Sequence, residues 1–128
     1  MAVNAVDLTA AASANDVRGV RRALRKGVDV NARGPQGGAT ALHYAVRPGA
    51  RDAIAALIEA GADPDLQDVN GNAPLWDAVL STRSGPGVVR ALIAVGADRN
   101  PKNRSGSSPL DYVIKVDGKD PSIFDTEA

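Results

Sequence analysis

His43 is the single histidine of this 128-residue chain, and the chain contains no cysteine. A Ser–His–Asp triad would have to be built on that one imidazole, and zinc would lack the several His or Cys ligands that it needs. A histidine of this kind most often forms hydrogen bonds with neighbouring backbone groups. We therefore expect a structural role for His43 and no catalytic site.

Three aspartates lie close together in the middle of the chain: Asp63, Asp65 and Asp68. Their spacing could be read as a calcium-binding loop, but the glycine and the distant glutamate of an EF-hand are missing. The glycine-containing segments 34–38 and 70–74 also lack the spacing of a phosphate-binding loop. Turns and helix caps explain these residues more simply, so we expect neither a metal nor any other cofactor.

The composition limits the class of protein. Fifteen basic and fifteen acidic residues cancel, so no overall field attracts the chain to nucleic acid or to an anionic membrane. The sequence has no apolar run long enough to span a membrane and no signal-peptide pattern at its start. The absence of cysteine suits a reducing cytoplasm, and the excess of arginine over lysine indicates a GC-rich genome. We expect a cytoplasmic protein of bacterial origin.

A repeat appears around three glycines. The segments GVDVN, GADPD and GADRN begin at Gly27, Gly61 and Gly96, which are 34 and 35 residues apart. An apolar triplet with i, i+3, i+4 spacing precedes each glycine, as on one face of a helix. Glycine ends such helices because it adopts a left-handed conformation without steric cost. The triplets are Val20, Ala23 and Leu24; Ile54, Leu57 and Ile58; and Val89, Leu92 and Ile93.

A second set of positions has the same period. The segments TALHYA, APLWDA and SPLDYV place Leu42, Leu75 and Leu110 at intervals of 33 and 35 residues. Thr40 and Ser108 are suited to cap helix N-termini, and a proline follows at 74 and at 109, where a missing N–H costs nothing. Each unit is therefore predicted to hold a short first helix, such as 40–47 or 73–81, and a second helix. The second helices are predicted at 16–26, 50–60 and 86–95.

These segments resemble the ankyrin repeat, a unit of about 33 residues with the signature T-P-L-H-x-A. Residues 40–45 match that signature at five of six positions. The resemblance implies an all-α solenoid of helix-turn-helix units with projecting β-turn or hairpin loops. It covers roughly residues 5–116, so residues 1–128 are predicted to form one domain. Three full repeats are expected at 5–37, 38–71 and 72–106, and a truncated capping repeat at 107–128.

The chain departs from the family pattern in several places. Segment 32–40 carries one extra residue in the first hairpin, and segment 80–89 carries two between the helices of the third unit. Ala73 and Trp76 replace the threonine and histidine of the signature, so that unit is expected to lack their hydrogen bonds. The last unit has no normal second helix; instead, a helical turn is expected near Pro121, with Ile123 and Phe124 folding back as a cap.

The resemblance also implies a binding surface. Members of the family usually bind partners through the hairpin tips and the exposed edge of the first helices, on the concave side. We therefore predict a non-catalytic protein–protein interaction module, monomeric and without cofactor. The predicted contact residues include five basic and no acidic side chains, which favours an acidic partner. They are Arg33, Gln36, Arg47, Gln67, Val69, Asn70, Asn72, Leu80, Lys102, Arg104 and Lys115.

Two alternatives belong to other functional classes. The chain could be a regulatory or protective accessory subunit of a specific enzyme, comparable to an immunity protein or an antitoxin. It could also bind nucleic acid through the arginine-rich helix predicted at 16–26. The neutral net charge and the lack of accompanying aromatic residues count against the second alternative, and a solvated end face explains the arginines more simply. They are Arg18, Arg21, Arg22 and Arg25, followed by Lys26.

Overall fold

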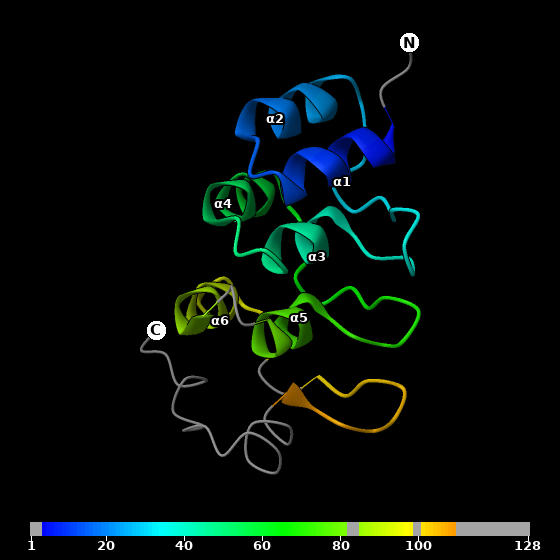
Figure 1. Ribbon diagram of the computed structural model, residues 1–128, viewed down its shortest axis with the longest axis vertical. Helices are drawn as coiled ribbons and strands as arrows, with labels where there is room; N and C mark the ends of the chain where they lie inside the picture. The colour runs from blue at the N-terminus through cyan, green and yellow to red at the C-terminus, as the bar shows by residue number, and fades with distance from the viewer. Residues whose placement is uncertain (1–3, 82–84, 99–100, 110–128) are drawn as a thin grey trace.

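The computed structural model of the chain describes residues 4–81, 85–98 and 101–109, within which six α-helices occur. Figure 1 shows three helix pairs stacked along the long axis, with α1, α3 and α5 in one row and α2, α4 and α6 in the other. The loops that follow the second helices project from the side of the first row. In chain order the helices are α1 (Ala5–Ser13), α2 (Val17–Arg25), α3 (Ala41–Val46), α4 (Arg51–Glu59), α5 (Pro74–Leu80) and α6 (Gly85–Ala94).

Each second helix ends in the same way. Gly27, Gly61 and Gly96 have φ angles of +94°, +93° and +96°, in the left-handed region that glycine enters without steric cost. Each glycine N–H donates to the carbonyl three residues earlier, and the next residue's N–H donates to the carbonyl five residues earlier. This pair of bonds is the Schellman motif, which satisfies the last carbonyls of a helix. The predicted role of the three glycines is confirmed.

The core lies between the two rows of helices. Leu8, Leu42 and Leu75, one from each first helix, are almost completely buried. Leu57 and Leu92 from the second helices are buried as well. Small residues accompany the leucines on the first helices and let the stacked helices approach closely, so that aliphatic side chains fill the space between them. Those small residues are Ala12, Ala45 and Ala78.

The loops between helix pairs are joined by hydrogen bonds that recur with the repeat. The Asp63 N–H donates to Oδ1 of Asn31 at 2.9 Å, and the Asp98 N–H donates to Oδ1 of Asp65 at 2.8 Å. Near the tips, the N–H of Val69 donates to the Gly37 carbonyl at 2.9 Å and that of Arg104 to the Asn70 carbonyl at 3.1 Å. Each loop thus fixes the position of the next one.

The predicted helices agree with the structure to within about one residue at each end. In the described part of the chain, the only β pairing is an isolated antiparallel bridge between Arg33 and Thr40. The first helix of the first unit, α1, was not predicted individually; Asn4 caps it, accepting from the N–H groups of Val6 and Asp7. None of the helices that the structure describes has the length and apolar character needed to cross a membrane.

Some sequence predictions fall outside the described residues. These are the cap formed by Ile123 and Phe124, the helical turn near Pro121, and the contact residue Lys115. The division into repeats at 5–37, 38–71, 72–106 and 107–128 also stays a prediction.

Candidate functional site

A hollow opens beside the first hairpin, where α1 and α3 face the loop that joins the first two units. Its volume is about 530 Å³. Val6 and Thr9 line it from α1, Pro35 and Gln36 from the hairpin, and Tyr44 from α3. Val6 is 51% exposed although it is apolar. The hollow therefore offers both an apolar contact and polar groups to a partner.

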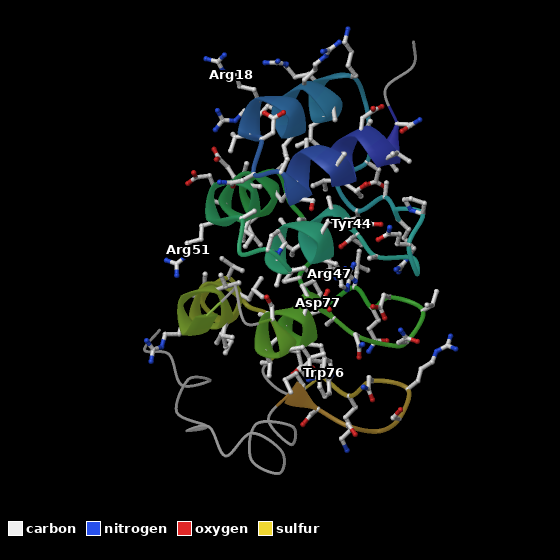
Figure 2. All side chains as sticks on the ribbon, viewed as in Figure 1. Arg18, Tyr44, Arg47, Arg51, Trp76 and Asp77 are labelled. Carbon is white, nitrogen blue, oxygen red and sulfur yellow. The ribbon has the colours of Figure 1, made fainter. Side chains whose placement is uncertain are left out.

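Tyr44 connects the hairpin to α3. Its hydroxyl oxygen accepts a hydrogen bond from the Gln36 N–H at 3.2 Å, which holds the start of the hairpin tip against the helix. The Arg47 guanidinium lies 5.5 Å from the centroid of the Tyr44 ring, within the range of a cation–π contact. Tyr44 and Arg47 both line the hollow, and Figure 2 labels the two residues near each other beside α3.

Arg47 also reaches into the next unit. Its Nε donates to Oδ2 of Asp77 at 3.1 Å, and its Nη2 lies 3.9 Å from Oδ2 of Asp68. The two carboxylates are almost entirely buried, whereas the Arg47 side chain is 39% exposed. The predicted contact residues contained no acid, but the structure places two carboxylates beside Arg47. Part of its charge is therefore compensated within the protein.

The buried position changes the acidity of Asp77. Burial raises the pKa of its carboxyl group from 3.8 to about 6, and the negative charge of Asp68 adds to the rise. The charge of Arg47 and its hydrogen bond act in the opposite direction and lower the pKa, but they offset only part of the burial effect. The effect of Arg47 on the pKa of Asp77 is limited because its guanidinium is partly solvated and is shared between Asp68 and Asp77.

His43 lies fully buried in α3 and joins two units. Its Nε2 is 2.8 Å from the Asn72 carbonyl oxygen, and because a carbonyl only accepts, Nε2 must carry the hydrogen. Its Nδ1 then accepts from the Thr40 N–H at 3.1 Å, and the Thr40 hydroxyl lies 2.8 Å from the same nitrogen. Burial lowers the pKa of His43 from 6.5, outweighing the Asn72 hydrogen bond, which raises it. This geometry agrees with the structural role expected for His43.

The predicted contact residues divide into two groups. Arg33 and Gln67 take part in bonds between loops: Arg33 Nη1 donates to the carbonyls of Gly38 and Gln67, and Gln67 Nε2 donates to the Lys102 carbonyl. The Asn72 carbonyl accepts from His43 of α3 and from the Asp68 N–H. These residues hold the loops together as well as lying at the surface. The remaining members with exposed side chains are Gln36, Val69, Asn70, Leu80, Lys102 and Arg104.

Two residues of this surface were missed by sequence reasoning. Val6 belongs to a first helix that was not predicted individually, and Tyr44 is at the variable position of the repeat signature, for which no partner contact was predicted. A signal for Val6 was present, because it is the second residue after Asn4, a residue type that commonly caps helices, and so lies in the first turn of α1. Tyr44 could be found only from its contacts with Gln36 and Arg47.

The three central aspartates stabilise the loop between α4 and α5: Asp63 and Asp68 accept bonds within it, and Asp65 accepts from the Asp98 N–H of the next loop. Asp63 Oδ1 accepts from the Asp65 N–H, and Asp68 Oδ1 accepts from the N–H groups of Asn70 and Asn72. Across residues 4–81, 85–98 and 101–109, no group of three or more His, Cys, Asp or Glu residues is arranged to hold a metal ion. The helix-capping role expected for these acids was wrong, because Ala60 and Ala73, and none of the three aspartates, are the caps of the neighbouring helices.

The arginines of α2 lie at the N-terminal end of the stack, and Figure 2 labels Arg18 at its outer edge. Arg18, Arg21, Arg22 and Arg25 are exposed, and their i, i+3, i+4, i+7 spacing puts them on one face of the helix. The nearest acid, Asp16, caps the helix by accepting from the Gly19 N–H at 3.0 Å. This face is therefore strongly basic, in contrast to the neutral whole.

Comparisons with known proteins agree with this architecture. Residues 8–68 match the family described as ankyrin repeats (3 copies). The chain is 40% identical to the "B-cell lymphoma 3 protein homolog" of Mus musculus over 84 residues, which are 65% of this chain and 18% of that protein. It is 37% identical to "Protein phosphatase 1 regulatory subunit 27" of Mus musculus over 83 residues, 65% of this chain and 52% of that protein.

A bacterial protein is similar as well. The chain is 33% identical to a "Putative ankyrin repeat protein" of Rickettsia felis over 100 residues, which are 73% of this chain and 44% of that protein. In each of these three cases the aligned part spans less than two thirds of the relative's own length. The chain belongs to the ankyrin-repeat family and has its all-α solenoid fold. Repeats of this family are generally non-catalytic modules that bind other proteins.

Proposed function

We propose that this ankyrin-repeat chain is a cytoplasmic, monomeric module that binds a partner protein through the hairpin tips and the exposed edge of its first helices. We call this surface the hairpin face and define it by Val6, Gln36, Tyr44 and Arg47, together with the predicted contact residues Val69, Asn70, Leu80, Lys102 and Arg104. The proposal includes no catalytic step and no cofactor.

The distribution of exposed apolar side chains carries the proposal. Four large apolar residues of the described chain are strongly exposed: Val6, Val69, Leu80 and Val95. Val6 and Leu80 belong to first helices and Val69 to a hairpin tip, so three of the four are on the elements of the hairpin face. Protein interfaces combine such apolar contacts with a polar rim, and Tyr44 and Arg47 are of the types enriched in them.

Two positive charges in the last described loop, those of Lys102 and Arg104, favour an acidic partner. Lys102 and Arg104 are exposed in the last described loop, and neither side chain forms an ion pair with any residue that the structure describes. Exposed charges of this kind steer the encounter with an oppositely charged surface. Arg47, whose charge is partly compensated by Asp68 and Asp77, contributes less to that attraction and more to the shape of the hollow.

The second candidate is a regulatory or protective subunit of one particular enzyme. One relative is named "Protein phosphatase 1 regulatory subunit 27", and this name favours the candidate over other uses of the fold. The same hairpin face would then bind the enzyme. The two candidates differ in whether the captured partner is an enzyme whose activity changes when this chain is bound.

Comparative affinity capture tests the proposal. The bait is the full chain in four forms: wild type, Val69→Ser, Leu80→Ser, and Val95→Ser, directly after α6, as the control. The two valines are 52% and 47% exposed, so both substitutions are expected to leave the fold intact. A partner quantified by mass spectrometry should be depleted by Val69→Ser and retained by Val95→Ser. The proposal is wrong if every enriched partner is retained by Val69→Ser and by Leu80→Ser.

Binding kinetics with the recovered partner then test the charge. Reversing Lys102 and Arg104 to Glu together should slow association, and the effect should shrink at high salt because exposed charges are screened over about 10 Å near 0.1 M. If reversal of Arg21 and Arg25 slows association while the Lys102/Arg104 pair has no effect, the partner binds α2 instead. An activity assay of a recovered enzyme, with and without this chain, decides between the two candidates.

A further inference from the structure

An apolar groove lies between α4 and α6, in the row of helices opposite the hairpins (Figure 1). Its volume is about 370 Å³, within the range of roughly 300–1,000 Å³ that is usual for small-molecule sites. Ile54, Ala55 and Ile58 line it from α4, Ala91 lines it from α6, and Val95 lines it directly after α6. Ala55, Ala91 and Val95 are exposed, so apolar surface remains uncovered along the groove.

One cation lies at an end of this groove. Arg51 is the first residue of α4, and its side chain has neither an ion pair nor a hydrogen bond with the residues that the structure describes. Figure 2 shows it at the outer edge, in the space between α4 and α6. A cation at a helix N-terminus is also unfavourable for the helix dipole. Helix stability therefore does not explain why Arg51 stands there.

The opposite helix leaves room for the guanidinium. Gly87 of α6 faces Arg51, and a Cβ added to it would lie 2.5 Å from Nη2 of Arg51. Any larger residue at position 87 would thus shift the guanidinium from its present position. The φ of Gly87 is not in the left-handed region, so backbone conformation does not require the glycine. The absence of a side chain at Gly87 leaves the space that the Arg51 guanidinium occupies. We call this space the recess at Gly87.

The two ends of the groove differ in charge. Glu59 lines the other end, eight residues after Arg51 on the same helix, which corresponds to about 12 Å along the axis. A ligand with a second negative group at that end would be repelled. Asp52, the neighbour of Arg51, is exposed and does not line the groove. The groove is therefore suited to one anionic group at the Arg51 end and an uncharged tail.

We propose that the groove between α4 and α6 binds an amphiphilic carboxylate, with its head on Arg51 and its aliphatic tail along Ile58 and Val95. The volume of the groove is about 370 Å³. If a methylene group needs about the same 30 Å³ as a water molecule, the groove accommodates a tail of roughly ten carbons. The planar guanidinium holds a carboxylate through two parallel hydrogen bonds. Burial of the tail against exposed alanine and valine removes apolar surface from water.

This site is separate from the hairpin face and does not rest on the proposed function. The two surfaces belong to different rows of helices (Figure 1), and Val95 is the only residue of the groove that the capture experiment alters. A ligand in the groove would contact two successive units at once. It would therefore stabilise their stacking, as any ligand specific to the folded state does.

Titration with decanoate, below its micelle concentration, tests the proposal. Methyl signals of Ala55, Ala91 and Val95 are followed by NMR with the full chain, and decanol serves as the uncharged probe of matched length. Wild type should bind decanoate at least about tenfold more tightly than decanol, since a charged hydrogen bond contributes about 1.5–3 kcal/mol. Equal affinities would show that Arg51 does not recognise the head group, and would overturn the proposal.

Four variants locate the site. Arg51→Met should weaken decanoate binding about tenfold and leave decanol unchanged, whereas Arg18→Met on α2, the matched control, should change neither. Gly87→Ala keeps the charge but displaces it, so it should weaken decanoate binding without affecting decanol. Ala91→Trp fills the groove and should prevent binding of both. Circular dichroism confirms that each variant is folded; folded Arg51→Met and Ala91→Trp proteins with wild-type decanoate affinity would overturn the assignment.

Discussion

His43 and Asn72 are 29 residues apart in the chain, yet the imidazole Nε2 donates to the Asn72 carbonyl oxygen over 2.8 Å. The same ring accepts from the N–H of Thr40 through its other nitrogen. One side chain thus caps α3 and fixes the loop that leads into α5. The repeat signature thus combines a helix cap with a bond between units, and one imidazole contributes to both.

His43→Ala should lower the free energy of unfolding by about 2–4 kcal/mol. The substitution leaves a cavity beside α3 and removes the partner of the Thr40 N–H. It also removes one of the two donors to the Asn72 carbonyl, which still accepts from the Asp68 N–H. Urea denaturation monitored by circular dichroism measures the change. Asn70→Ala, at an exposed position of the same loop, is the control and should cost less than about 0.5 kcal/mol. Equal effects of the two substitutions would contradict the structural role of His43.

The titration of His43 makes the protein less stable in weak acid. Its pKa is below 6.5 when the protein is folded, so the unfolded chain takes up a proton first as the pH falls. The stability contributed by the neutral ring is complete above pH 6.5 and is lost as the pH falls from 6.5 through the lower folded-state pKa. The substitution Asp77→Asn removes the opposing titration of Asp77. In that protein the free energy of unfolding should decrease from pH 7 to pH 5 because of His43. An increase over that range would contradict the assignment.

Asp77 has the opposite effect on stability. Its pKa is about 6 in the folded state and 3.8 in the reference state, so the folded protein binds the proton more tightly. The contribution is complete below pH 3.8 and is lost as the pH rises through about 6. In a His43→Gln protein the free energy of unfolding should therefore rise by about 1 kcal/mol from pH 7 to pH 5. Urea denaturation at both pH values measures the difference, and a fall would show that Arg47 keeps Asp77 ionised.

Much of the fold could be predicted from local sequence. Gly27, Gly61 and Gly96 occur at nearly equal intervals, and glycine at the end of a helix has a specific backbone consequence. Leu42 and Leu75 could be assigned to the core because helical spacing determines which side chains share a face. The structural role of His43 was likewise predicted from its place in the repeat signature TALHYA. These features depend on a few consecutive residues, whose conformation the local sequence determines.

The site depends on distances that the local sequence does not determine. Arg47 and Asp77 are 30 residues apart, and their ion pair forms only because α3 and α5 stack with one particular offset. The recess at Gly87 likewise exists only because α6 places it opposite Arg51. Sequence reasoning selected the exposed positions of the hairpin face but could not foresee that Arg33 and Gln67 would bond to neighbouring loops. The relative orientation of the helices is set by core packing, which involves residues from several helices and cannot be read from one segment of the sequence.

Leu57→Ala should be among the most damaging single substitutions in the second unit. Leu57 was assigned to the core face of its helix, and in the structure its side chain is completely buried in the middle of the stack. The loss of a fully buried leucine typically costs about 2–5 kcal/mol, a large part of the total stability of a small domain. Glu59→Ala, two residues later and exposed, is the control. Denaturation midpoints that shift equally for both would refute this core assignment.

Gly71→Ala and Gly61→Ala separate backbone strain from close packing. Both glycines have positive φ angles, +79° and +93°, so alanine at either position costs about 1–2 kcal/mol in conformational energy. At Gly61 an added Cβ would meet nothing within 4 Å, whereas at Gly71 it would lie 2.7 Å from the backbone nitrogen of Arg104. That nitrogen donates to the Asn70 carbonyl, so the methyl group must push the last two described loops apart.

Gly71→Ala should therefore destabilise the protein more than Gly61→Ala in urea denaturation. It should also speed hydrogen exchange of the Arg104 amide, an effect that Gly61→Ala should not produce. Equal destabilisation together with an unchanged Arg104 exchange rate would mean that the loops are not in contact at this point.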